Sequence, residues 1–129
     1  MHEKLIETIK LKNRMRLDIF DCSRKLAGDR WLIKLVARLK IPVSEVLSQN
    51  ISYSKEAIKE IKKALGEQVF FEQKRERFFI DETEKATIFK ELYDSFMTST
   101  LDYLANDAFP EKYVLKKFRE KVEKDAFYH

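Results

Sequence analysis

The sequence contains little of what catalytic and metal sites are built from. Cys22 is the only cysteine, so the chain can form no internal disulfide and no multi-cysteine metal site. The only histidines, His2 and His129, stand at the two ends, where order is often poor, and this argues against a histidine base, triad or metal ligand. We therefore expect no metal, no cofactor and a reducing, cytoplasmic environment.

Glycine and long apolar runs are equally scarce. Gly28 and Gly66 are the only glycines and stand too far apart to build a glycine-rich phosphate loop, so nucleotide chemistry is not expected. No window approaches the roughly 18 apolar residues of a membrane span. Charges also interrupt the N-terminal stretch where a secretion signal would need an apolar core. We expect no association with a membrane.

Charged and hydrophobic residues are abundant instead. Of the 129 residues, 37% are charged and 44% hydrophobic, which is typical of a folded chain with a densely charged surface, and we expect one domain over residues 1–129. The net charge of +4 is unevenly distributed. Residues 1–66 hold 15 Lys and Arg against 8 Asp and Glu, whereas residues 67–129 hold 11 against 14. The basic surplus is therefore N-terminal.

Alternation of apolar and polar residues predicts an antiparallel sheet of three to four strands. A hairpin is centred on Asn13, with its second strand at about 14–21, and apolar residues at every odd position predict a long strand over 31–43. A helix stays open as the alternative for 31–43, because a helical stripe is formed by Leu32, Leu35, Val36 and Leu39. Residues 69–80 fit neither period, and their aromatic and β-branched ends favour a strand.

Three helices are predicted after the long strand. The first spans about 54–65, with Ser54 as its N-cap and Gly66 as its C-terminal stop. The second spans about 82–106 and the third about 110–124, both with apolar residues at helical spacing. Strands followed mainly by helices indicate an α+β fold, with the helices packed on one face of the sheet.

Shorter signals mark the ends of these elements. Ser44 can cap a short helical turn after Pro42, and Asp81 with Glu84 resembles a capping box at the start of the second helix. The chain is expected to fray after Asp125.

The strand alternation places basic side chains on the face of the sheet opposite its apolar face. Seven residues make up this predicted basic face: Lys10, Lys12, Arg14, Arg16, Lys34, Arg38 and Lys40. Among the polar positions of these strands only Asp18 offsets them, so the face would attract nucleic acid or an acidic protein. We therefore expect a non-enzymatic binding module, although Phe20 is the only stacking aromatic on this face among residues 5–43.

The segment from Asp21 to Trp31 is read as a connection between strands and as a candidate ligand loop. Its guanidinium and ammonium groups suit phosphate or carboxylate and its indole ring suits stacking, the residues being Arg24, Lys25, Arg30 and Trp31. This loop would serve a ligand-binding protein or a small enzyme. The other interpretation is a solvated hairpin loop in which Asp29 pairs with Arg30 and Trp31 anchors the core.

Two further features stay open. Apolar surface for a partner protein, or for a second copy in a homo-oligomeric structural or regulatory protein, would come from Phe70, Phe71, Phe78 and Phe79. Cys22 is interpreted as a small buried hydrophobe and not as a nucleophile.

Two stretches resemble a known group of proteins. Arg24 to Arg38 (RKLAGDRWLIKLVAR), with Phe71 to Ile80 (FEQKRERFFI), resembles small bacterial proteins of similar length that carry no assigned activity. The resemblance covers about a fifth of the chain. It brings no catalytic motif, so it implies no function for any residue.

Overall fold

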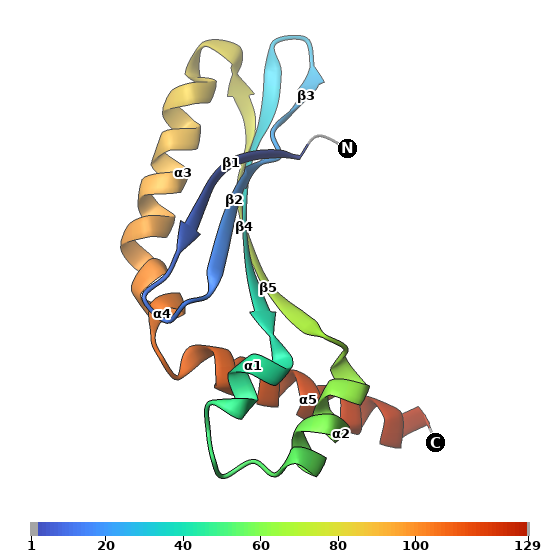
Figure 1. Ribbon diagram of the computed structural model, residues 1–129. Coiled ribbons are helices and arrows are strands. Elements are labelled where there is room, and N and C mark those ends of the chain that lie inside the picture. Colours follow the sequence, from blue (N-terminus) through green and yellow to red (C-terminus); the bar gives the residue numbers. More distant parts are fainter. Residues whose placement is uncertain (1–2, 129) are drawn as a thin grey trace.

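One antiparallel sheet forms the centre of the fold, and helices pack on one of its faces and around one of its ends (Figure 1). The computed structural model describes residues 3–128, so His2 and His129 lie outside the described residues. The strands are β1 (Lys4–Lys10), β2 (Arg16–Asp21), β3 (Arg24–Ala27), β4 (Arg30–Pro42) and β5 (Gln68–Asp81). The helical elements are α1 (Val43–Ser48), α2 (Lys55–Leu65), the 3-10 turn η1 (Glu82–Glu84), α3 (Lys85–Ser99), α4 (Leu101–Ala105) and α5 (Phe109–Tyr128). The predicted α+β class is confirmed.

β4 is the central strand, and it is the long strand that alternation predicted. β5 pairs with it along its whole length, while β2 and β3 pair one after the other with its opposite edge. Lys34 bridges the break between β2 and β3: its amide donates to Ser23 Oγ at 3.0 Å, and its carbonyl oxygen accepts from the Cys22 amide at 2.9 Å. β1 pairs only with β2 and is an edge strand.

The core lies between the sheet and α3. Odd positions of β4 point towards this helix, and Leu35, Ala37 and Leu39 are fully buried there. From α3, the side chains of Leu92 and Phe96 pack into the same core, and these residues are 2% and 0% exposed. Burial of apolar area is the main favourable term in folding, so this layer fixes which face of the sheet is covered.

A second group of contacts holds the other end of the sheet. The Phe71 ring of β5 meets the Phe109 ring of α5 edge to face, with 5.4 Å between their centroids. Tyr113 of α5 also contacts Phe71, and its hydroxyl donates to the Phe70 carbonyl oxygen at 3.1 Å. In Figure 1, α1, α2 and α5 gather at this end, away from α3.

The first predicted hairpin is present, but its turn is longer than expected. β2 begins at Arg16 and not at about residue 14, and the positive φ of 72° falls on Arg14 and not on Asn13. The side-chain amide nitrogen of Asn13, Nδ2, donates to the carbonyl oxygens of Leu104 and Asn106 at 2.8 and 3.0 Å. These long-range bonds hold Asn13 in place within the turn. They cannot be predicted from the residues next to Asn13 in the sequence.

The segment 21–31 is not simply a connection, because β3 forms within it and returns through a tight turn into β4. Gly28 in that turn has a φ of +56°, which glycine adopts without strain. A four-residue strand is too short for its alternation to stand out against a charged sequence.

The helix predicted over 82–106 is divided. η1 occupies its start, and Thr100, with φ −121°, separates α3 from α4. Arg75 of β5 donates to the hydroxyls of Ser95, Ser99 and Thr100, each at 3.0 Å. Ser99 also donates to the Ser95 carbonyl oxygen, a bond that bends helices.

The other helix ends are partly as predicted. Ser54 caps α2 by accepting from the Ala57 amide at 3.0 Å, and Gly66 ends that helix with a φ of +89°. Ser44 does not cap α1, which begins one residue earlier without a side-chain cap. α5 continues to Tyr128, so the expected fraying after Asp125 is wrong.

Candidate functional site

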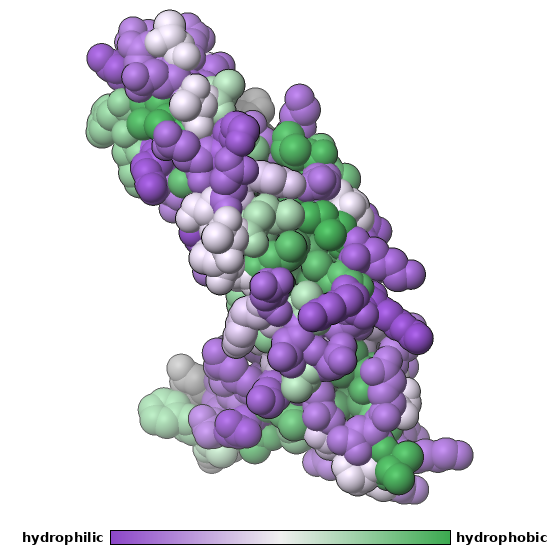
Figure 2. Space-filling model, turned by 90° about the vertical axis from the view of Figure 1, so that its left-hand side faces the viewer, coloured by the Kyte–Doolittle hydropathy of each residue, from purple (hydrophilic) through white to green (hydrophobic). Residues whose placement is uncertain are grey.

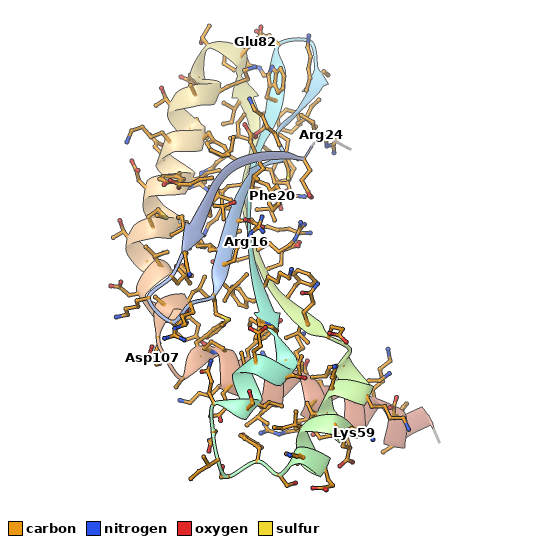
Figure 3. The ribbon with its side chains drawn as sticks, in the orientation of Figure 1. Arg16, Phe20, Arg24, Lys59, Glu82 and Asp107 are labelled. Carbon is orange, nitrogen blue, oxygen red and sulfur yellow. The ribbon has the colours of Figure 1, made fainter. Side chains whose placement is uncertain are left out.

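The face of the sheet opposite α3 is called the open face here, because Figure 1 shows no helix over its middle strands. It carries the even positions of β4 and their partners on the neighbouring strands. Figure 3 shows Arg16 and Phe20 of β2 on the side of the sheet that points away from α3.

A line of basic residues crosses the open face in register. Lys10 of β1 lies opposite Arg16 of β2, and Arg16 lies opposite Lys40 of β4. Neighbouring strands are about 4.8 Å apart, so the three side chains emerge side by side. Lys40 in turn lies opposite Phe70 of β5, a residue that is 46% exposed. We call Lys10, Arg16 and Lys40 the basic row.

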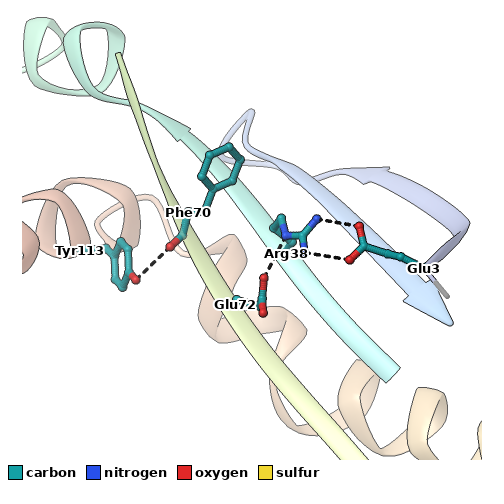
Figure 4. Close-up of polar contacts among 5 residues, drawn as sticks. All are labelled: Glu3, Arg38, Phe70, Glu72 and Tyr113. Carbon is teal, nitrogen blue, oxygen red and sulfur yellow. Dashed lines mark hydrogen bonds and ion pairs between the residues drawn. The ribbon is translucent and has the colours of Figure 1, made fainter. Parts of the chain in front are cut away.

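Arg38 lies on the same face as the basic row, but its charge is paired with carboxylates of the protein. Arg38 donates two hydrogen bonds to Glu3, both at 3.2 Å, and one to Glu72 at 2.9 Å (Figure 4). These bonds raise the pKa of Arg38 and lower the pKa of Glu3. The guanidinium carbon also lies 4.8 Å from the centre of the Phe20 ring. The charge of Arg38 is therefore satisfied within the protein.

The remaining members of the predicted basic face are not part of the basic row, although Lys34 is also on the open face. Lys34 is half-buried and faces Glu76 across the β4–β5 pair. Lys12 and Arg14 lie in the β1–β2 turn, beside a hollow of about 650 Å³ that Asp107 and Glu111 also line. Asp18 was expected as the only acid among the polar positions of the predicted strands, and the structure adds acids from β5 and from before β1, namely Glu3, Glu72 and Glu76.

Three of the four candidate loop residues meet at a groove. Arg24, Lys25 and Trp31 line a groove of about 800 Å³ between β1, the β3–β4 hairpin and the start of α3. Arg30 does not line it. Its guanidinium lies 3.8 Å from Asp29 and 3.5 Å from Asp81, so the predicted local pair with Asp29 is present and a second partner comes from β5.

The described residues offer no other evident chemical centre. Residues 3–128 contain no group of three or more His, Cys, Asp or Glu side chains able to hold a metal ion. Cys22 is half-buried, and burial raises the pKa of its thiol, which disfavours the nucleophilic thiolate. No helix in this part of the chain is long and apolar enough to cross a membrane.

Several residues at these two surfaces were not identified from the sequence. Phe70 was assigned to an apolar partner surface, and only the register of β5 against β4 places it beside Lys40. The groove also takes Ile6 and Lys4 from β1 and Phe89 from α3. No local pattern could have shown this, because these elements are far apart in sequence.

Comparisons were made with protein-family models, curated proteins and solved structures. None matches this chain. The resemblance of Arg24 to Arg38 and Phe71 to Ile80 to small bacterial proteins therefore stays a prediction, and the function is argued from geometry alone.

Proposed function

We propose that this chain is a non-enzymatic module that binds single-stranded nucleic acid on the open face of its sheet. The observation that carries the proposal is the basic row, three cations in register that end beside the exposed ring of Phe70. Proteins that bind single strands combine cations along the phosphate backbone with aromatic rings on which bases stack. The proposed contacts are phosphates on the basic row and a base on Phe70.

The charges of the basic row are available to a partner. Lys10 and Lys40 have no ion pair within residues 3–128. Arg16 lies 3.1 Å from Asp18, but its side chain is 57% exposed, and surface pairs of this kind contribute little stability. Replacing Asp18 by a phosphate as the partner of Arg16 therefore costs little free energy. If a phosphate bound Arg38 instead, Glu3 and Glu72 would lose their hydrogen-bond donor, which is costly.

The shape of the open face favours a single strand over a duplex. No helix projects from the sheet there to enter a major groove, and Figure 4 shows the Phe70 ring directed away from Tyr113 of α5. An exposed ring can stack only on an unpaired base. Binding is expected to be largely independent of base sequence, since stacking and phosphate contacts read no base edges.

The test is the affinity of a fluorescently labelled oligothymidylate, measured by anisotropy at several salt concentrations. Wild-type binding should weaken steeply with salt as counterions are released. The double variant Arg16→Gln, Lys40→Gln should bind more weakly and reduce the slope of log K against log salt by about 1.4, or about 0.7 for each phosphate that is no longer neutralised. Phe70→Ala should bind at least about fivefold more weakly.

A matched control removes two exposed lysines from α2, in the variant Lys59→Gln, Lys63→Gln, with the same change in net charge. It should leave both affinity and slope close to wild type. No binding by the wild-type protein at about 50 mM salt, where phosphate contacts are strong, would exclude the proposal. Equal reductions of affinity in the two double variants would show that only net charge matters.

A second candidate function, association with a protein or a second copy of the chain, is favoured by one observation. Phe78 and Phe79 are 59% and 70% exposed, and Phe79 has a φ of 56°, which is strained for a bulky residue. Sedimentation at increasing protein concentration tests self-association, and Phe78→Ser with Phe79→Ser should abolish any dimer that uses this surface.

A further inference from the structure

The groove beside Trp31 lies on the α3 side of the sheet and is therefore separate from the open face. Trp31 and Ile33 reach it from odd positions of β4, and Lys85 and Phe89 reach it from the first turns of α3. Its volume of about 800 Å³ is within the range of small-molecule sites. Figure 2, which looks onto the α3 side, shows hydrophobic patches (green) at the surface between hydrophilic residues (purple).

The walls of the groove are apolar, and the wall formed by β1 depends on a bulge in that strand. The β1–β2 register shifts between Leu5 and Glu7, so Ile6 is the extra residue of a bulge and leaves the ladder. Its side chain is 45% exposed and lines the groove. Ile33 and Phe89 line the same space, so an apolar ligand segment would be enclosed by aliphatic and aromatic carbon.

The rim of the groove carries a surplus of positive charge. Four bases line it against one acid, Asp21, and the bases are Lys4, Arg24, Lys25 and Lys85. Lys4, Arg24 and Lys25 make no ion pair or side-chain hydrogen bond within the described part of the chain. Asp21 accepts a hydrogen bond from the Ser23 amide at 2.9 Å.

One face of the Trp31 ring is already in contact with a cation of the protein. The Lys85 ammonium lies 3.7 Å from the centre of the indole ring and so occupies one ring face. The indole N–H is buried and has no hydrogen-bond partner among the described residues. A buried donor without an acceptor is costly. Lys85 blocks a flat aromatic ligand from stacking on that ring face, whereas an alkyl chain does not need to stack.

We propose that this groove binds a single-chain amphipathic carboxylate, that is, a free fatty acid. The alkyl chain lies along Ile6, Ile33 and Phe89, and the carboxylate pairs with Lys4 and Lys25, which the strand register places on the α3 side. Charge complementarity selects the anionic head, and the apolar walls select the chain over a nucleotide or a free phosphate. The inference does not depend on nucleic-acid binding, because the two surfaces lie on opposite sides of the sheet.

The chain carries its own reporter for this test, since Trp31 is its only tryptophan. Dodecanoate, added below the concentration at which it forms micelles, should change the tryptophan fluorescence in a saturable way. Affinity should rise about two- to fourfold per methylene from decanoate to tetradecanoate, as each methylene leaves water. Dodecanol, which has the same chain without the charge, should bind at least about tenfold more weakly.

Paired variants separate the two surfaces. Lys4→Gln with Lys25→Gln should weaken dodecanoate binding about tenfold or more while leaving oligothymidylate binding unchanged. Lys10→Gln with Lys40→Gln should do the reverse, and circular dichroism checks that both variants fold. Absence of a saturable change would overturn the proposal, as would equal affinities for dodecanol and dodecanoate. A response to phospholipid vesicles but not to monomeric dodecanoate would also overturn it, in favour of a lipid surface.

Discussion

Arg38 shows how a single residue decides whether a charge on this sheet is free to act. Its guanidinium bonds to Glu3 and Glu72 and lies over the Phe20 ring, whereas Lys10 and Lys40 have no such partners within residues 3–128. The alternation of the sequence places all these bases on one face. It cannot show which of them meets a carboxylate, because Glu3 and Glu72 come from segments that only the folded sheet brings close.

Tyr93 is a residue whose protonation links β1 to α3. Its hydroxyl donates to Glu7 Oε1 at 2.5 Å, and this bond raises the pKa of Tyr93 to about 12. The folded protein therefore holds this proton more tightly than the unfolded chain, where tyrosine titrates near about pH 10. The stabilisation is complete below that value and is lost as the pH rises towards the folded pKa.

Tyr93→Phe should accordingly lower the free energy of unfolding by about 1 kcal/mol at neutral pH, the usual contribution of one hydrogen bond. The difference between variant and wild type should shrink when urea unfolding is repeated at about pH 11, between the two pKa values. A difference that stays constant from neutral to alkaline pH would show that the Tyr93–Glu7 bond does not form in solution.

At the scale of elements, the long regular segments were predictable and the short ones were not. Alternation over thirteen residues identified β4, because burial on the α3 face repeats at every second position. β3 has four residues, and its pairing with β4 depends on the turn at Gly28. The break at Thr100 depends on Arg75, which reaches it from β5. A tight local turn decided the first case, and a contact between distant elements decided the second.

The predicted inward stripe of α3 gives a test at this scale. Phe96 is fully buried, so Phe96→Ala should cost about 3–5 kcal/mol in the free energy of unfolding, because apolar burial is removed and a cavity forms. Lys90 on the outer face only pairs with Asp94, and Lys90→Ala should cost about 0.5 kcal/mol or less. Similar denaturant midpoints for the two variants would mean that α3 is turned the other way.

On the scale of the whole molecule, one sheet presents two different surfaces. The open face exposes the basic row and Phe70, and the α3 side exposes an apolar groove with a basic rim. The N-terminal surplus of bases indicated an acidic partner in general terms. It could not separate the two surfaces, because the strands interleave residues of both, as Lys10 and Lys4 do on β1.

The candidate site was therefore only partly accessible from the sequence. Lys10, Arg16 and Lys40 were placed on one face by alternation, and the register brings them into one row. Lys12 and Arg14 were misplaced because the turn is longer than the pattern suggested. The exposed Phe70 beside the basic row comes from β5, whose period gave no clear signal.

The central claim, that single-stranded nucleic acid binds the open face, is tested most directly by amide chemical shifts. The 15N-labelled protein is titrated with oligothymidylate at about 50 mM salt, where phosphate contacts are strong. We expect the largest shift changes on the open face, around Arg16, Lys40 and Phe70, and no change at Lys85 and Phe89 on the α3 side. Changes confined to the α3 side, or no changes at all, would contradict this claim.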